Sequence, residues 1–201
     1  MSKVLYIKAN VKPEGQSKTF SVSDSFINEY KQLHPQDEII TLDLYKEGIG
    51  FLSMEDIMTV FGPKTEESKN HPILKYAYQF AEADKYVIAE PFWNLSVPAI
   101  LKAYIDYVCV TGITFDYTEN GPVGMLQGKK AVNIVGRGGK YSVEPFTNFE
   151  MGDRYLRTIF GFFGIVDFTT IAAEDLDVDG KDINAILDES ISKAKEVAKT
   201  F

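Results

Sequence analysis

A single cysteine and two histidines in 201 residues leave little room for metal or thiol chemistry. Cys109 cannot form a disulfide within the chain, and its position at the end of an apolar helical pattern favours a core residue over a nucleophile. His34 and His71 each precede a proline, so we expect both in solvated loops. Without HExxH or paired Cys/His spacing, the sequence predicts no metal site.

Long apolar runs and clustered basic residues are also missing. No run approaches the ~20 residues of a membrane-spanning helix, and a strand-like segment already begins at Lys3, which leaves no space for a signal peptide. The net charge of −8 argues against nucleic acid as the main partner, because phosphate neutralisation needs clustered Lys and Arg. With one cysteine, which fits a reducing compartment, we expect a cytoplasmic protein that binds neither membranes nor nucleic acid.

What the sequence does contain is enough apolar material for one domain, residues 1–201, because hydrophobic residues make up 45% of the chain and aromatic residues 13%. Apolar strand-like runs alternate with helical patterns. We predict strands at 4–9, 39–44, 85–90, 129–135 and 167–172, helices at 16–33, 65–83, 97–108, 152–163 and 183–198, short helical patches within an irregular excursion at 45–64, and a hairpin within 113–126. This alternation predicts an α/β, flavodoxin-like, doubly wound five-stranded parallel sheet of order 2-1-3-4-5 with helices on both faces.

The most informative stretch is 90–106, EPFWNLSVPAILKAYID, which joins the third strand to the following helix. Pro98 suits the first helical turn, and Ser96 is expected to cap it. Between strand and helix lie Phe92, Trp93, Asn94 and Leu95, although connecting loops normally expose polar residues. Because ligands bind at the carboxyl ends of strands in open α/β sheets, this loop offers an apolar surface and an amide to a planar heterocycle.

Two further segments lie at predicted strand ends. Ser17, Lys18 and Thr19 open the first helix; they serve either as helix caps or as a phosphate cradle of backbone amides and hydroxyls. The run Gly136, Arg137, Gly138, Gly139 follows the fourth strand, where glycines permit the backbone to approach a ligand closely. A flexible loop is the alternative for this run. We favour a binding role, because a flat cofactor requires two such loops on adjacent strands.

Together these segments resemble the FMN-dependent NADH-azoreductase and NADH:quinone oxidoreductase family over essentially the whole chain. The similarity is carried by Pro91-Phe92-Trp93-Asn94, Val97-Pro98, the run from Leu101 to Asp106, TFDYTENGPVG at 114–124 and the GRGG run at 136–139. Ser17-Lys18-Thr19 matches the family's S-x-S/T pair. A serine that some members have just after the first strand is absent; Ala9 and Asn10 stand there, and Asn10 is the candidate to replace its polar contact.

The resemblance implies non-covalently bound FMN, with its phosphate at Ser17, Lys18 and Thr19. The ring would lie between the loop at 92–95 and the loop at 136–139, with Arg137 near the pyrimidine edge. It implies NADH or NADPH as co-substrate, two-electron reduction of quinones and reductive cleavage of azo compounds by a ping-pong mechanism, and no catalytic acid or base besides the residues that position the flavin. It also implies a homodimer whose sites are completed by the partner subunit.

Two patterns remain outside this site. The aromatic run at 159–163, IFGFF, exceeds what one helix face is expected to bury, which favours an oligomer interface over a bulky internal core. The acidic residues Glu174, Asp175, Asp177 and Asp179 are expected to form a solvated loop.

The main alternative function is a flavodoxin-type electron carrier without a substrate of its own. Acidic charge is common to both kinds of protein and does not separate them, whereas the aromatic excess favours a dimeric enzyme with a covered site. A phosphodiesterase acting on acyl carrier protein, a label attached to some relatives, finds no hydrolytic motif in this sequence.

Overall fold

The computed structural model describes residues 1–13 and 15–201. In these residues, five parallel strands form one sheet in the order β2-β1-β3-β6-β7, which confirms the predicted order 2-1-3-4-5. The strands are β1 (Lys3–Lys8), β2 (Glu38–Asp43), β3 (Lys85–Pro91), β6 (Lys130–Gly136) and β7 (Asp167–Ala173). The predicted hairpin is also present, as the antiparallel pair β4 (Phe115–Thr118) and β5 (Gly121–Gly124).

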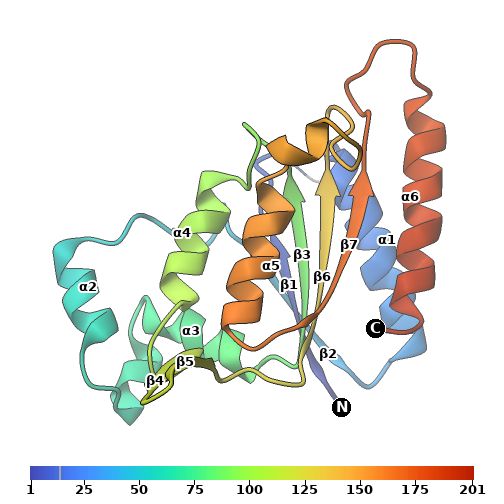
Figure 1. Ribbon diagram of the computed structural model, residues 1–201. Coiled ribbons are helices and arrows are strands. Elements are labelled where there is room, and N and C mark those ends of the chain that lie inside the picture. The colour runs from blue at the N-terminus through green and yellow to red at the C-terminus, as the bar shows by residue number, and fades with distance from the viewer. Residues whose placement is uncertain (14) are drawn as a thin grey trace.

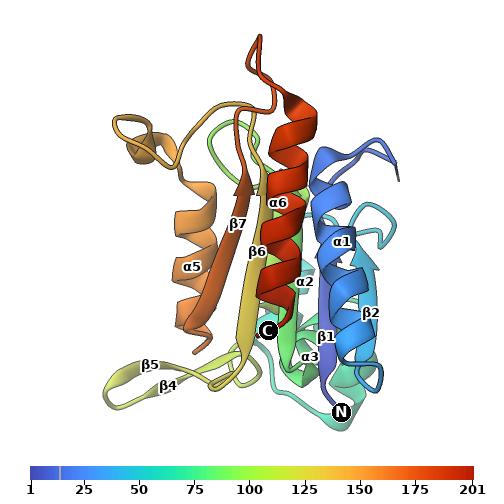
Figure 2. The same cartoon turned by 90° about the vertical axis from the view of Figure 1, so that its right-hand side faces the viewer.

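Helices cover both faces of the sheet, as predicted (Figures 1 and 2). One face carries α1 (Lys18–Leu33) and α6 (Ile183–Ala198), and the other carries α3 (Leu74–Glu82), α4 (Ala99–Val108) and α5 (Gly152–Phe162). The short helix α2 (Met54–Phe61) lies at the margin of the molecule, beyond α4 (Figure 1). No helix in the described part of the chain is long and apolar enough to cross a membrane.

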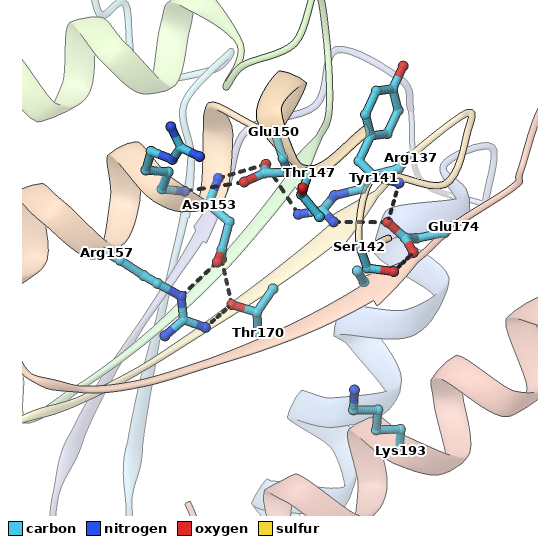
Figure 3. A pocket seen from close by; sticks show the side chains of 12 residues that line it. Arg137, Tyr141, Ser142, Thr147, Glu150, Asp153, Arg157, Thr170, Glu174 and Lys193 are labelled. Carbon is cyan, nitrogen blue, oxygen red and sulfur yellow. Dashed lines mark hydrogen bonds and ion pairs between the residues drawn. The ribbon is translucent and has the colours of Figure 1, made fainter. Parts of the chain in front are cut away.

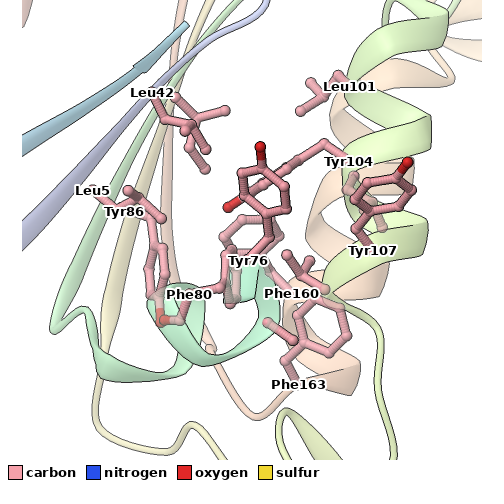
Figure 4. Packing of buried hydrophobic residues seen from close by; sticks show 14 of the residues in the cluster. Leu5, Leu42, Tyr76, Phe80, Tyr86, Leu101, Tyr104, Tyr107, Phe160 and Phe163 are labelled. Atoms are coloured by element: carbon pink, nitrogen blue, oxygen red, sulfur yellow. The ribbon is translucent and has the colours of Figure 1, made fainter. Parts of the chain in front are cut away.

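The near-continuous apolar strands bury both of their faces. Because side chains alternate along a strand, Leu5 and Ile7 of β1 face the core under α3, α4 and α5, whereas Val4 and Tyr6 face α1 and α6. Figure 4 shows the first of these cores, in which Tyr86, Phe80 and their neighbours fill the space between sheet and helices. This packing fixes the strand ends, and therefore the loops that follow them.

The expectation that the aromatic run forms an interface is wrong for two of its rings. Phe160 and Phe163 are 2% and 0% exposed, and both rings contact Phe80 of α3. Phe162 is half-buried and packs its ring on Phe115 of the hairpin. The run is buried within the chain because the helix end and the turn after it face different neighbours, so that one helix face need not accommodate every ring.

Three predicted helices begin later than expected. Helix α1 begins at Lys18 instead of residue 16, because Ser17 is its N-cap. The segment 65–83 is broken into a 3-10 helix, η1 (Glu66–Asn70), and α3, because Pro72 cannot continue an α-helical hydrogen-bond ladder. Helix α4 begins at Ala99 with Pro98 as its N-cap and without a side-chain cap among the described residues. The predicted capping role of Ser96 is therefore wrong, because its backbone instead closes a tight turn with Trp93.

Candidate functional site

Four loops meet where β1, β3, β6 and β7 end, at the upper edge of the sheet in Figure 1. Backbone hydrogen bonds continue across them beyond the strands: the Phe92 amide donates to the Gly136 carbonyl at 2.8 Å, and the Leu176 amide donates to the Arg137 carbonyl at 3.1 Å. The chain order of the strands reverses between β1 and β3, which is where open α/β sheets bind ligands.

The start of α1 provides a cradle for an anion. Ser17 is the N-cap, and its Oγ accepts from the Phe20 amide at 3.1 Å and from Asn10 Nδ2 at 2.9 Å. Its hydroxyl hydrogen remains free to donate, since neither bond uses it. The amides of Lys18 and Thr19 have no acceptor within the helix, because they belong to its first turn. Orphan amides beside hydroxyl groups at a helix start are suited to a phosphate.

A small cavity of about 100 Å³ opens beside this cradle. It is lined by eight of the predicted residues, Asn10, Lys18, Thr19, Phe92, Trp93, Gly136, Arg137 and Gly138, and by Lys12, Pro91, Leu176 and Asp177. The other four predicted residues are not in its lining. Ser17 lies behind Asn10, Asn94 and Leu95 form the turn after Trp93, and Gly139 follows Gly138.

The turn at 93–96 is held in a rare backbone conformation. Asn94 and Leu95 have φ angles of 50° and 67°, in the left-handed region. The Trp93 and Ser96 backbones exchange two hydrogen bonds of 3.0 Å, and the Met151 amide donates to the Leu95 carbonyl at 3.1 Å. Left-handed conformation in a residue such as Leu costs of order 1–3 kcal/mol, and it persists only where the surroundings impose it. The turn leaves Trp93 38% exposed beside the cavity.

Contacts within the chain explain why positions 136 and 138, at the end of β6 and just after it, are glycine. A Cβ at Gly136 would lie 2.6 Å from Thr19 Oγ1, and one at Gly138 would lie 2.7 Å from Asp177 Oδ2. The close approach predicted for this run is therefore made first to the chain's own side chains. Gly136 lets Thr19 stay in the cradle, and Gly138 lets Asp177 reach Lys18, which it pairs with at 3.3 Å.

Arg137 is buried, with its side chain 5% exposed, between two carboxylates (Figure 3). Nη2 pairs with Glu150 Oε1 at 3.2 Å and Nη1 with Glu174 Oε1 at 3.0 Å. The guanidinium carbon lies 5.5 Å from the centre of the Phe92 ring. The side chain is thus engaged from within the chain, and its predicted place beside the pyrimidine edge of a flavin stays a prediction.

Glu174 is a correction to the expected solvated acidic loop. Its side chain is 12% exposed, and it accepts hydrogen bonds from the Tyr141 amide, from Ser142 and from Arg137. Burial alone would raise the pKa of Glu174, but the bonds from Ser142, Arg137 and Tyr141 outweigh it and lower the pKa below its ordinary value. Its position directly after β7, at a strand's carboxyl end, was the signal in the sequence that could have found it.

A larger, more open cavity of about 540 Å³ lies on the β7 side of this cluster (Figure 3). Asp153 of α5 bridges there to Arg157 at 2.7 Å, and Arg157 Nη2 donates to Thr170 Oγ1 at 2.6 Å. The sequence pattern did not indicate this arrangement, because Thr147, Asp153 and Lys193 come from segments without a motif of their own.

Comparison with known proteins agrees with this geometry. A family model described as having a flavodoxin-like fold matches residues 2–198. The FMN-dependent NADH:quinone oxidoreductase 2 of Clostridium acetobutylicum is 71% identical over 201 residues, the full length of both chains. The crystal structure of azoreductase from Bacillus anthracis str. Sterne superposes with a TM-score of 0.90 at 36% identity over 100% of both chains. An FMN-dependent NADH-azoreductase from Bacillus anthracis str. Ames Ancestor, solved in complex with FMN, gives 0.89 at 28% identity and covers 100% of this chain and 99% of that one.

The fold defines a flavodoxin-like protein whose candidate site lies at the β1/β3 switch point. The chain belongs to the flavodoxin-like family that contains the FMN-dependent NADH:quinone oxidoreductases and azoreductases.

Proposed function

We propose that this protein is an FMN-dependent NAD(P)H oxidoreductase that reduces quinones by two electrons and reductively cleaves azo compounds. The observation that carries the proposal is that the cradle at the start of α1 lies beside the loops at 92–95 and 136–139, at the switch point of the sheet. Support also comes from the 71% identity to a relative named FMN-dependent NADH:quinone oxidoreductase 2.

The residues present fit FMN. The amides of Lys18 and Thr19, which have no partner among the described residues, and the Ser17 hydroxyl are donors suited to its phosphate, and Asn10 holds Ser17 in place at 2.9 Å. A side chain at position 136 would displace the Thr19 hydroxyl from the cradle, since its Cβ would lie 2.6 Å from Thr19 Oγ1. The ring is expected to lie between two walls. One wall is the loop Phe92, Trp93, Asn94 and Leu95, and the other is the backbone of Gly136, Gly138 and Gly139. The Arg137 guanidinium supports Phe92 from within the chain.

Bound FMN would supply the redox chemistry, taking two electrons from NADH or NADPH and giving them to a flat acceptor. The chain's own residues bind and orient. The turn at 93–96 fixes Trp93 at the mouth of the cavity, where one apolar face can serve the nicotinamide and the acceptor in turn. Alternating use of one face produces ping-pong kinetics. No side chain at the cavity is required as acid or base in this scheme.

We further propose a homodimer. With the aromatic run buried, support comes from α2 and the segment before it, where Phe51, Met54, Met58 and Phe61 are 86%, 74%, 67% and 68% exposed. Within α2, Met54, Met58 and Phe61 recur at helical spacing, so they share one face. Met and aromatic residues are enriched at protein interfaces, and a second copy is the partner that would cover this face. The family resemblance also implies that the partner subunit completes the site at which small aromatic acceptors would bind.

A cytoplasmic location is the remaining part of the proposal. Cys109 packs its side chain against the core, and burial raises the pKa of its thiol. A chain with this single cysteine suits a reducing compartment.

The decisive experiment is anaerobic mixing of the FMN-loaded protein with NADH and, separately, with NADPH. Loss of the oxidised-flavin absorbance within minutes, its return on adding a quinone, and parallel initial-rate lines are expected. A protein that takes up no FMN would refute the cofactor. A protein that holds FMN but responds only to a chemical reductant would be a carrier instead of an enzyme.

A further inference from the structure

Glu90 is a buried carboxyl group that the proposed chemistry does not use. It is the next-to-last residue of β3, which leads into the loop that carries Phe92 and Trp93, and it is 0% exposed. In the register of β3 with β6, Glu90 is opposite Val135. Because side chains alternate, Asn133 and Arg137, two residues to either side of Val135, share its face of the sheet. Glu90 therefore lies between an amide and a guanidinium.

Four polar atoms in this small region have no partner among residues 1–13 and 15–201. They are Oε1 and Oε2 of Glu90, Oδ1 of Asn133 and Nε of Arg137. As a carboxylate, Glu90 would bring this set to three acceptors and one donor. With one added proton the set becomes two donors and two acceptors, so that every atom can be paired. Buried polar atoms are almost always paired, because an unpaired one keeps its full cost of desolvation.

The electrostatics of the surroundings agree with this count. Burial raises the pKa of Glu90 well above its ordinary value. The Asn133 amide lies close enough to favour the charged form, although no well-formed hydrogen bond joins the two, and the Arg137 charge acts in the same direction. Against these, Glu150 and Asp153, which face Glu90 from α5 and the residues before it, raise the pKa further. Burial is the largest of these effects.

The charge of Arg137 is already balanced by two carboxylates. Its two terminal nitrogens already pair with Glu150 and Glu174, so a charged Glu90 would place three carboxylates around one guanidinium. A neutral acid can still accept a hydrogen bond from the remaining Nε–H. That bond would hold the guanidinium plane at its third corner, on the side away from solvent, while the group lies 5.5 Å from the Phe92 ring centre.

We propose that Glu90 is a positioning residue held as a neutral carboxylic acid. Its hydroxyl donates to Asn133 Oδ1, its carbonyl oxygen accepts from Arg137 Nε–H, and the guanidinium is thereby fixed against Phe92. The expected effect of Glu90 on cofactor binding rests on the proposed function, whereas the proposed protonation state of Glu90 does not.

The protonation state can be tested on the full-length chain freed of flavin. If Glu90 is protonated when folded and ionised when unfolded, unfolding releases one extra proton. The unfolding constant of the wild type, divided by that of E90Q, should then rise about tenfold per pH unit above about pH 5, until the pH passes the raised pKa. Gln keeps one donor and one acceptor, so E90Q should fold. Glu66, whose side chain is 89% exposed, gives the control E66Q, for which the ratio should stay flat.

A rise of at least tenfold in this ratio between pH 5 and pH 7 supports the neutral acid, and a smaller rise overturns it. The positioning role is read from FMN affinity against pH. Wild-type affinity should fall as Glu90 ionises at alkaline pH, whereas E90Q should keep its affinity. Parallel affinity profiles would overturn the positioning role. If the wild type binds no FMN at any pH, the proposed function fails while the unfolding test still decides the state of Glu90.

Discussion

Gly136 and Thr19 touch across the join between β6 and α1, since a Cβ on Gly136 would lie 2.6 Å from Thr19 Oγ1. A methyl group at 136 must therefore push the Thr19 hydroxyl out of the cradle. We expect Gly136→Ala to weaken FMN binding at least tenfold, as measured by quenching of flavin fluorescence. Gly161→Ala is the matched control, because Gly161 is an exposed position of α5 and, in the described part of the chain, a Cβ there would meet nothing within 4 Å beyond its own helix. That change should leave binding intact and stabilise the fold by about 0.5–1 kcal/mol.

Two helix caps allow the structural role of Ser17 to be separated from its binding role. Ser17 caps α1 at the site, and Asp182 caps α6, where its side chain accepts from the Ala185 amide. Ser17→Ala and Asp182→Ala should each lower the free energy of unfolding by about 1 kcal/mol in urea titrations. Ser17→Ala alone should also weaken FMN binding. Equal FMN affinity in the two variants would remove the Ser17 hydroxyl from the phosphate site.

The left-handed turn predicts an unusual response to glycine. Leu95 and Leu33 are 39% and 46% exposed, so both lose similar apolar burial when truncated. At Leu95, glycine relieves a left-handed penalty of about 1–2 kcal/mol, whereas at Leu33, the last residue of α1, it only loses helix propensity. Leu95→Gly should therefore cost less stability than Leu33→Gly in thermal unfolding. The reverse order would contradict the strain assigned to this turn.

Glu174 predicts a loss of stability in acid. Its pKa is lowered in the fold because hydrogen bonds from Ser142, Arg137 and Tyr141 outweigh burial. A carboxyl group with a depressed pKa contributes stability above its unfolded pKa, and this is lost as the pH falls through the folded value. The wild type should be more stable than E174Q at pH 6, and the gap should narrow below the ordinary pKa of 4.5. Urea unfolding at several pH values measures it; a gap independent of pH would contradict the assignment.

The exposed apolar face of α2 predicts the behaviour of an interface variant. Met58 is 67% exposed in the middle of this face, and an aspartate there would bury a charge in any contact made through it. Met58→Asp should shift the molecular mass measured by light scattering from dimer to monomer. Leu33→Asp, an apolar-to-acidic change on α1 at the opposite face of the sheet, should leave a dimer. A dimeric Met58→Asp variant would place the interface elsewhere.

The sequence predicted those features that depend on local pattern. Doubly buried strands read as continuous apolar runs, so the sheet order followed from the alternation of strands and helices. The predicted ends of the third and fourth strands, residues 90 and 135, lie one residue before the observed ends at Pro91 and Gly136. The predicted helix 65–83 extended too far towards the N-terminus, because the apolar residues that indicate it all lie after Pro72, where α3 forms. The aromatic run was misjudged because periodicity does not reveal which neighbour each ring meets.

The sequence predicted the cradle and the two loops of the site but not the side chains that hold Arg137 in place. The cradle and the two loops have recognisable residues, whereas no sequence pattern pairs Arg137 with its partners, Glu150 and Glu174. Nor could the sequence show that Gly136 is required by Thr19, because that contact joins residues more than a hundred positions apart. Contacts between side chains from distant segments follow from the assembled fold.

The hydrogen bonds that extend the sheet past β3, β6 and β7 have a consequence for how such a protein can change over evolutionary time. They join main-chain atoms of Phe92, Gly136, Arg137 and Leu176, so the spacing of these loops does not depend on what most of their side chains are. Residues at the mouth of the cavity, Trp93 above all, can therefore be exchanged without displacing the cradle at the start of α1. Related proteins can therefore come to use different electron acceptors through substitutions at the mouth of the cavity, while the cradle at the start of α1 stays unchanged.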